Sequence, residues 1–288
     1  MFILRLPSAI ILISLIIAGT YANGAYGRII FTFTAMMFAF LAVFEFLDII
    51  SKTGRRSYAF TSSLAGAVLV LLMVIMRKNV SDLPLFELKY LAIFAIILWM
   101  ILLFSRTRED VLAKVVNSIS GFVLVAVPLS FMVLIYLIED GTKDAAGRKL
   151  FLYLVAVTKA GDIGAYVAGV SSSKLMSGGN HKIVPSISPK KSWEGTVGGL
   201  VLSIVVAVLL VKILPAPYKM GDFTAASIGA ILFIGGFIGD LSESSLKRIA
   251  GVKDSGQIVP GIGGVLDLLD SLILNSPLFF IFLIPMMK

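Results

Sequence analysis

Long runs of apolar residues, separated by shorter polar segments, occupy most of the chain. A helix that spans a membrane needs about 20 predominantly apolar residues, and nine runs approach or reach that length. None of them alternates apolar and polar residues over ten positions, as the strands of a transmembrane barrel do. The runs therefore predict an all-α polytopic membrane protein with about nine transmembrane helices, at Ile3–Tyr21, Ile29–Ile50, Tyr58–Met76, Leu88–Phe104, Val115–Ile138, Leu150–Val170, Thr196–Leu214, Phe223–Gly239 and Val265–Pro285.

The composition supports this fold class and excludes others. Of the 288 residues, 58% are hydrophobic and 15% are charged, and the mean hydropathy is +0.99. Soluble domains have about 45–50% apolar and about 25% charged residues, so an ordinary soluble enzyme and a disordered protein are excluded. The chain has no cysteine, which excludes a disulfide scaffold, a thiolate metal site and a cysteine nucleophile.

The distribution of basic residues gives the expected orientation. The net charge is +8, which in a membrane protein is more typical of cytoplasmic loops near anionic lipid than of nucleic-acid binding. With a cytoplasmic N-terminus, slightly more Lys and Arg lie on the cytoplasmic side. The first run has no small-residue cleavage motif after it, so we interpret it as a retained helix. The two longest polar segments, Ser171–Gly195 and Asp240–Gly264, then both face the cytoplasm.

Several charged residues interrupt the apolar runs. An ionised carboxylate in hydrocarbon costs several kcal/mol, so such residues usually face a polar cavity or a partner. Glu45 and Asp48 lie near a helix end, and we interpret them as structural residues that reach the interface or pair with nearby Lys or Arg. Lys159 and Asp162 lie inside one run, where the lysine can neutralise the aspartate.

Asp267 and Asp270 lie three residues apart at the start of the last run. On a helix these positions share a face, and two like charges repel there unless a cation lies between them. Carboxylate oxygens are ligands that suit Mg²⁺. The alternative is a pair of acids at a helix N-terminus, stabilised by the helix dipole, and the pair alone does not decide between the two interpretations.

The polar segment that begins at Asp240 extends the case for phosphate chemistry. If its first part is helical, Asp240, Glu243, Ser244 and Lys247 share one face, although a solvated amphipathic helix has the same pattern. A glycine-rich stretch follows and ends at Gly264, and glycine backbone can approach phosphates closely. Carboxylates with lysine, arginine and a metal are the groups used in phosphoryl or nucleotidyl transfer.

The other polar segment presents Lys190 and Lys191 after Pro189, in a turn that displays two ammonium groups. An anchor that follows the positive-inside rule is the alternative interpretation. His181 is the one histidine in the chain, and without a second histidine or a cysteine we interpret it as a loop residue rather than a zinc ligand.

These motifs together resemble the signature of the CDP-diacylglycerol synthases, or phosphatidate cytidylyltransferases. The resemblance covers roughly the C-terminal half, from Asp162 onward. It rests on Asp162 with Ala165-Tyr166, on Ser188-Pro189-Lys190-Lys191-Ser192-Trp193-Glu194-Gly195, and on Ser244, Lys247-Arg248, Lys253-Asp254, Pro260-Gly261, Gly263-Gly264, Asp267 and Asp270. Ile262 and Leu268 stand where the family usually has His and Arg; they remove two phosphate contacts and leave every carboxylate in place.

The resemblance implies an enzyme that makes CDP-diacylglycerol and pyrophosphate from CTP and phosphatidic acid in phospholipid biosynthesis. It implies Mg²⁺, with room for a second cation, on Asp240, Asp267 and Asp270, and a catalytic role for these residues and Lys247. The implied substrate-binding residues are Asp162, Ser188, Lys190, Lys191, Glu243, Ser244, Arg248, Lys253, Asp254, Gly261, Gly263 and Gly264.

The expected enzyme is one integral membrane unit, with scaffold helices over residues 1–145 and a catalytic region over residues 146–288. Its active-site cavity lies at the cytoplasmic membrane interface, open to the lipid bilayer and to CTP. We expect a bacterial-type cytoplasmic membrane, no nucleic-acid partner, and a homodimer as one assembly.

Alternatives remain at this point. A secondary transporter also places charges in a membrane and breaks helices with glycine, but it predicts an internal repeat, and we find none. A related enzyme could use CTP on another lipid phosphate, or phosphorylate a polyprenol. The CDP-alcohol phosphotransferases are a poorer match, because their Asp-Gly-x-x-Ala-Arg motif is absent. A purely structural membrane protein explains neither the paired aspartates nor the paired lysines.

Overall fold

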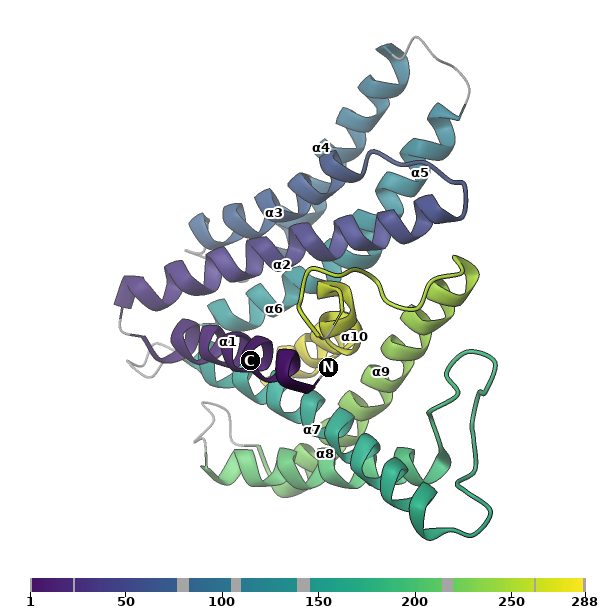
Figure 1. Ribbon diagram of the computed structural model, residues 1–288. Helices are drawn as coiled ribbons and strands as arrows, with labels where there is room; N and C mark the ends of the chain where they lie inside the picture. Colours follow the sequence, from purple (N-terminus) through teal and green to yellow (C-terminus); the bar gives the residue numbers. More distant parts are fainter. Residues whose placement is uncertain are drawn as a thin grey trace. The chain divides into compact units, whose positions relative to one another are not determined.

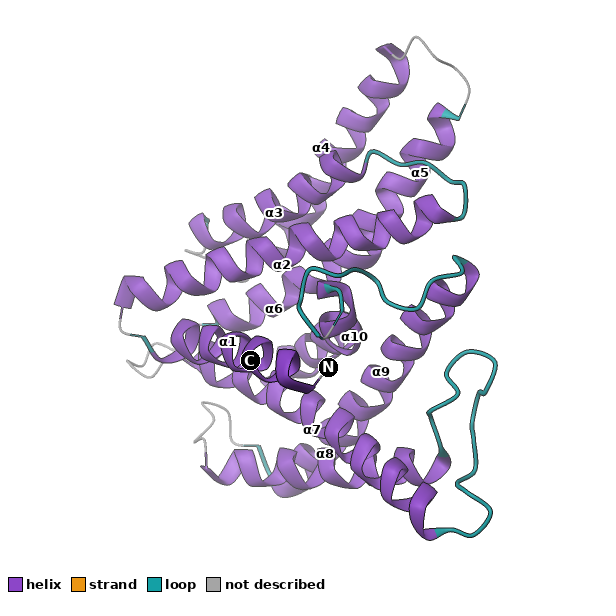
Figure 2. Cartoon of the chain, in the orientation of Figure 1, coloured by secondary structure: helices purple, strands orange, loops and turns teal. Residues whose placement is uncertain are grey.

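The computed structural model describes residues 2–22, 24–76, 83–104, 110–138, 146–213, 220–261 and 263–286. No strand occurs in these ranges, so the predicted all-α fold is confirmed (Figure 2). The helices in chain order (Figure 1) are α1 (Phe2–Tyr21), α2 (Gly24–Lys52), α3 (Ala59–Ile75), α4 (Leu83–Phe104), α5 (Val111–Gly121), the π-helix η2 (Phe122–Ala126), α6 (Val127–Leu137), α7 (Ala146–Leu175), α8 (Trp193–Ile213), α9 (Asp222–Ile249), α10 (Val265–Leu283) and the short 3₁₀-helix η3 (Ile284–Met286).

Seven of the described helical segments are long and apolar enough to cross a membrane. They are Ala25–Lys52, Leu85–Phe104, Val111–Leu137, Ala146–Leu175, Trp193–Ile213, Asp222–Ile249 and Val265–Met286. Two further apolar helices, Ile10–Tyr21 and Ala59–Ile75, are shorter. Each of the nine predicted runs thus contains a helix, and the chain is a polytopic integral membrane protein, while nine crossings remain a prediction.

Helix α9 is longer than the apolar run that predicted it. The run ends at Gly239, but the helix continues to Ile249. The stretch from Asp240 to Lys247 is therefore helical, which is the condition under which its acidic and basic residues share one face.

The chain forms two compact units. Unit 1 comprises Met1–Leu137 and Ile249–Leu269, and unit 2 comprises Ile138–Arg248 and Asp270–Lys288. The glycine-rich segment and the first residues of α10 therefore belong to the unit of the N-terminal helices. The assignment of scaffold and catalytic roles to residues 1–145 and 146–288 stays a prediction.

In unit 1, α2 packs along α3, and α5, η2 and α6 form one continuous span beside them (Figure 1). Gly121 leaves room for the side chain of Leu47, which would lie 2.7 Å from an added Cβ. The π-helical turn ends two residues before Pro128, whose missing N–H and bulky ring disturb a regular helix. Near the end of α2, Asp48 Oδ2 pairs with Lys52 Nζ at 2.7 Å, so the expected pairing of Asp48 is confirmed.

In unit 2, α7 and α8 approach closely at small residues, as membrane helices often do (Figure 1). A Cβ on Gly164 would lie 2.7 Å from the backbone oxygen of Gly198. Asn275 of α10 is fully buried and ties three helices together, because its Nδ2 donates to Thr158 Oγ1 of α7 at 2.9 Å and to the Leu232 oxygen of α9 at 2.8 Å. Helices α7, α9 and α10 therefore have a fixed arrangement where their polar residues meet.

Candidate active site

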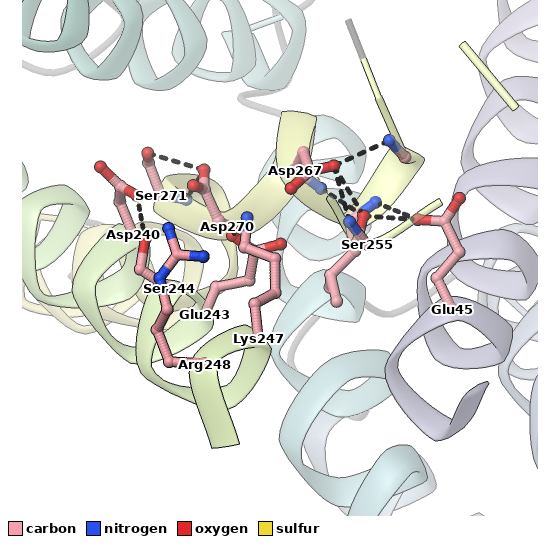
Figure 3. Close-up of polar contacts among 12 residues, drawn as sticks. Glu45, Asp240, Glu243, Ser244, Lys247, Arg248, Ser255, Asp267, Asp270 and Ser271 are labelled. Atoms are coloured by element: carbon pink, nitrogen blue, oxygen red, sulfur yellow. Dashed lines mark hydrogen bonds and ion pairs between the residues drawn. The ribbon is translucent and has the colours of Figure 1, made fainter. Parts of the chain in front are cut away.

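Three carboxylates of unit 2 come together where α9 and α10 meet (Figure 3). Asp240 and Glu243 lie one turn apart on α9, and Asp270 lies on α10. One oxygen from each carboxylate lies within 4.8 Å of the others. The two helices can approach this closely because residue 239 is glycine; a Cβ there would clash with the backbone oxygen of Asp270. The local sequence of α9 thus places the acidic group.

Two lysines pair with this carboxylate group. Lys191 Nζ lies 2.9 Å from Asp240 Oδ2, donates to the Phe237 oxygen at 3.2 Å and lies 4.2 Å from the centre of the Phe237 ring. Lys247 Nζ lies 2.5 Å from Glu243 Oε2, and the Glu243 residue is only 7% exposed. The acidic group therefore lies among lysine side chains, which reduce the repulsion between its carboxylates.

The donor set fits a hard divalent cation. All three side chains offer oxygen only, and Mg²⁺ prefers carboxylate oxygens with substrate phosphates completing its coordination. The sequence-based metal set contained Asp267, whereas the structure groups Glu243 with Asp240 and Asp270. The role of Asp267 as a metal ligand stays a prediction.

Ser271 connects the acidic group to Asp162. Its Oγ lies 3.0 Å from Asp270 Oδ1 and 3.4 Å from each carboxylate oxygen of Asp162. Lys159 Nζ lies 3.0 Å from Asp162 Oδ2, so the expected neutralisation of Asp162 by Lys159 is confirmed. Ser244, one turn after Asp240, donates to Asp240 Oδ1 at 3.3 Å. Sequence reasoning did not single out Ser271, whose one signal is its place beside Asp270.

The segment with the two lysines is folded against α7, α8 and α9. Ser192 caps α8, since its Oγ accepts from the Gly195 N–H at 3.1 Å, and it also accepts from Asn180 Nδ2 at 3.1 Å. The backbone oxygen of Ser188 accepts from the Lys191 N–H at 3.2 Å, which closes the turn. Lys190 is exposed on this turn, and Arg248 Nε donates to the Ile187 oxygen at 3.3 Å. His181 lies in the loop as predicted, with its Nδ1 2.6 Å from Glu194 Oε1.

The glycine-rich segment of unit 1 is organised by Asp267. Its Oδ2 accepts from Ser255 Oγ at 2.9 Å, from the Ser255 N–H at 3.1 Å and from the Gly264 N–H at 2.8 Å. Gly261 and Gly263 have φ angles of 77° and 133°, which favour glycine over other residues. The segment is thus a defined loop.

The structure also shows how exposed the remaining residues of the signature are. Lys253 and Asp254 are exposed on the same segment, and Leu268 is half-buried in α10. Ile262 lies outside the described residues.

Glu45 differs from its expected role. Its carboxylate does not pair with the neighbouring basic residues in the described structure; it accepts hydrogen bonds from Ser255 and from the first N–H groups of α10. Sequence reasoning missed both Glu45 and Ser255 as parts of the site region. The signal for Glu45 was an acid in an apolar run, but its partners lie more than 200 positions away.

Clustered carboxylates with adjacent lysines in a helical membrane protein fit a membrane-bound nucleotidyltransferase, and the comparison with known families identifies the chain as one. The chain belongs to the cytidylyltransferase family, whose model matches residues 3–285. The transporter and purely structural alternatives are therefore not supported.

Similar proteins include several phosphatidate cytidylyltransferases. The enzyme of that name from Staphylococcus saprophyticus is 32% identical over 249 residues, which cover 86% of this chain and 89% of the relative. The one from Haemophilus influenzae is 39% identical over 140 residues, covering 47% and 46%. The uncharacterized protein YnbB of Escherichia coli is 42% identical over 142 residues, covering 49% and 45%. In the last two alignments the chain thus spans less than half of the relative's length.

Proposed function

We propose that the protein transfers the cytidylyl group of CTP to phosphatidic acid, giving CDP-diacylglycerol and pyrophosphate. The observation that carries this proposal is the group of Asp240, Glu243 and Asp270, flanked by Lys191 and Lys247, in a chain of the cytidylyltransferase family. The names of the relatives, phosphatidate cytidylyltransferases among them, favour phosphatidic acid as the acceptor.

In the proposed reaction an oxygen of the phosphatidic acid phosphate attacks the α-phosphorus of CTP. The bond between the α-phosphorus and the oxygen that bridges to the β-phosphorus breaks, and pyrophosphate leaves with the electron pair. Phosphatidic acid is an anion at neutral pH, so the attack needs no strong general base. The main barrier is the repulsion between two polyanions.

The chain's own residues reduce this repulsion. Asp240, Glu243 and Asp270 would hold Mg²⁺, which when bound neutralises charge on the α-phosphate and the leaving pyrophosphate. Lys191 and Lys247 lie beside these acids, where their ammonium groups can bind phosphate oxygens. Asp162 orients Lys159 through an ion pair and Ser271 through a hydrogen bond. Ser244 orients Asp240, to which it donates a hydrogen bond.

The resemblance supplies further assignments, which we propose on that ground. Ser188, Lys190 and Arg248 bind substrate from unit 2. In unit 1 the substrate-binding residues are Lys253, Asp254, Gly261, Gly263 and Gly264, and Asp267 is a further metal ligand that also orders their loop. We further propose that the same acids can hold a second cation, that the protein forms a homodimer, and that it does not bind nucleic acid.

We propose that the site opens at the cytoplasmic face of a bacterial-type cytoplasmic membrane. Phosphatidic acid would enter from the bilayer and CTP from the cytoplasm, into a cavity at the interface. The slight excess of basic residues on that side, with a cytoplasmic N-terminus, supports this orientation.

The experiment that tests the function compares acceptors. The purified full chain in detergent micelles receives CTP, Mg²⁺ and either phosphatidic acid, an isoprenoid ether lipid phosphate or a polyprenol. We expect CDP-diacylglycerol from phosphatidic acid, loss of the product with excess EDTA, and recovery when Mg²⁺ is restored. A product from the polyprenol, with none from phosphatidic acid, would show that the substrate assignment is wrong.

A further inference from the structure

Glu45 is a buried carboxylate of α2 that binds a distant part of unit 1. The residue is 3% exposed and lies in a predominantly apolar helix. Its Oε1 accepts from the Val265 N–H at 3.1 Å, and its Oε2 accepts from the Leu266 N–H at 2.8 Å. These are the first two N–H groups of α10, which have no partner within their own helix. Glu45 therefore caps α10 from another helix, with a charge that the helix dipole favours.

Two glycines of the loop make this contact possible. A Cβ on Gly256 would clash with Glu45 Oε1, and a Cβ on Gly264 would clash with Glu45 Oε2 and Ser255 Oγ. Gly264 was assigned to phosphate binding by the resemblance, but the geometry gives it a second reason to be glycine. The loop packs its backbone directly against a buried carboxylate.

Ser255 joins Glu45 to Asp267. The residue is 1% exposed, and its Oγ lies 3.1 Å from Glu45 Oε2 and 2.9 Å from Asp267 Oδ2. The same Oγ accepts from the Asp267 N–H at 3.3 Å. A hydroxyl has one proton, so it donates to one carboxylate at a time while it stays in contact with both. The position of Asp267 thus depends on Ser255, and that of Ser255 on Glu45.

We propose that Glu45 and Ser255 are positioning residues for the transfer reaction. Glu45 fixes the start of α10 and the glycine-rich loop, and Ser255 passes this constraint to Asp267. The inference rests on the proposed function, in which Asp267 and the loop act on the metal and the phosphates.

The test is Glu45→Gln in the full-length protein. Glutamine keeps the size of the side chain but has one acceptor oxygen, and its NH₂ group would face a backbone N–H. We expect kcat to fall about 10- to 100-fold, because small misplacement of reacting groups costs that much. We also expect the Mg²⁺ concentration that half-maximally raises the thermal unfolding temperature of the substrate-free protein to rise severalfold, as should the concentration for half-maximal rate. A merely structural role would reduce the amount of active protein and leave both concentrations unchanged.

Asp48→Asn is the matched control, because Asp48 lies on the same helix and pairs with exposed Lys52. It should stay within about twofold of wild type on both measures. Ser255→Ala keeps the backbone contacts of Glu45 and removes the hydroxyl that joins Glu45 to Asp267, so it should also raise the Mg²⁺ requirement. Size-exclusion chromatography and thermal unfolding show whether Glu45→Gln folds. If it does not, the Mg²⁺ requirement of Ser255→Ala tests the positioning role.

A folded Glu45→Gln variant with a wild-type Mg²⁺ requirement would overturn the inference. If Glu45→Gln does not fold, a wild-type Mg²⁺ requirement in Ser255→Ala would overturn it instead. A wild-type protein that makes no CDP-diacylglycerol would instead overturn the proposed function. The two failures are therefore distinguishable. The double variant adds a further check, since residues that act through one route should show a combined loss well below the product of the single losses.

Discussion

Replacing Asp240 by Asn is expected to lower kcat by at least about 10³-fold, the range found when a central catalytic group is removed. The substitution removes one of three clustered carboxylates and leaves Lys191 without its charged partner. A divalent cation binds more weakly to the two carboxylates that remain, because it loses one charged oxygen ligand. The rate of Mg²⁺-dependent transfer from labelled CTP into lipid measures the effect. Asp270→Asn should behave in the same way.

The matched control for this prediction is Asp222→Asn on the same helix. Asp222 forms an exposed pair with Lys212 at 2.9 Å, and such pairs contribute little. Its activity should stay within about twofold of wild type. Added Mg²⁺ should raise the thermal unfolding temperature of wild type and of Asp222→Asn, but not of Asp240→Asn, because a bound ligand stabilises the folded state. An Asp240→Asn protein with more than a tenth of wild-type activity would contradict the metal assignment.

Replacing Lys191 by Met is the second large prediction, and it separates nucleotide binding from metal binding. The side chain of Lys191 is 15% exposed and lies between Asp240 and the Phe237 ring. Methionine retains most of the apolar stem and removes the ammonium group. We expect kcat/KM for CTP to fall about 10²-fold, mainly through a higher KM, since a charge-assisted contact to phosphate is lost.

The Mg²⁺ requirement of Lys191→Met should stay the same or decrease, because the acidic group then has one positive charge fewer beside it. This direction is opposite to the effect expected for Asp240→Asn. Lys212→Met, at an exposed lysine of unit 2, is the control and should leave both values unchanged. An unchanged KM for CTP in Lys191→Met would show that this lysine holds Asp240 without binding substrate.

The sequence alone predicts the features that depend on local periodicity. Apolar runs of about 20 residues located the membrane helices, because a helix in lipid must satisfy its backbone internally and present apolar side chains. The spacing of Asp240, Glu243 and Lys247 put them on one face if the stretch was helical, and α9 supplies that helix. The same logic linked Lys159 to Asp162.

Contacts between distant segments could not be predicted in this way. Lys191 reaches Asp240 from a loop that hydrogen bonds such as the one between Asn180 and Ser192 hold in place, and no sequence periodicity indicates that contact. From the sequence, Glu45 was expected to reach the interface or to pair with nearby basic side chains. Its partners in the structure lie far along the chain, at the start of α10, and no local pattern indicates them. Asp267 and Asp270 had the same signal at i and i+3. The structure binds Asp267 to the loop and groups Asp270 with the acids of α9.

The most direct test of the central claim is the fate of two phosphorus labels. CTP labelled at the α-phosphate and CTP labelled at the γ-phosphate are incubated separately with the purified protein, phosphatidic acid and Mg²⁺. The proposed attack at the α-phosphorus predicts that the α label enters the lipid and the γ label leaves as pyrophosphate. A γ label in the lipid, with no α label there, would show phosphoryl transfer instead and would contradict the account.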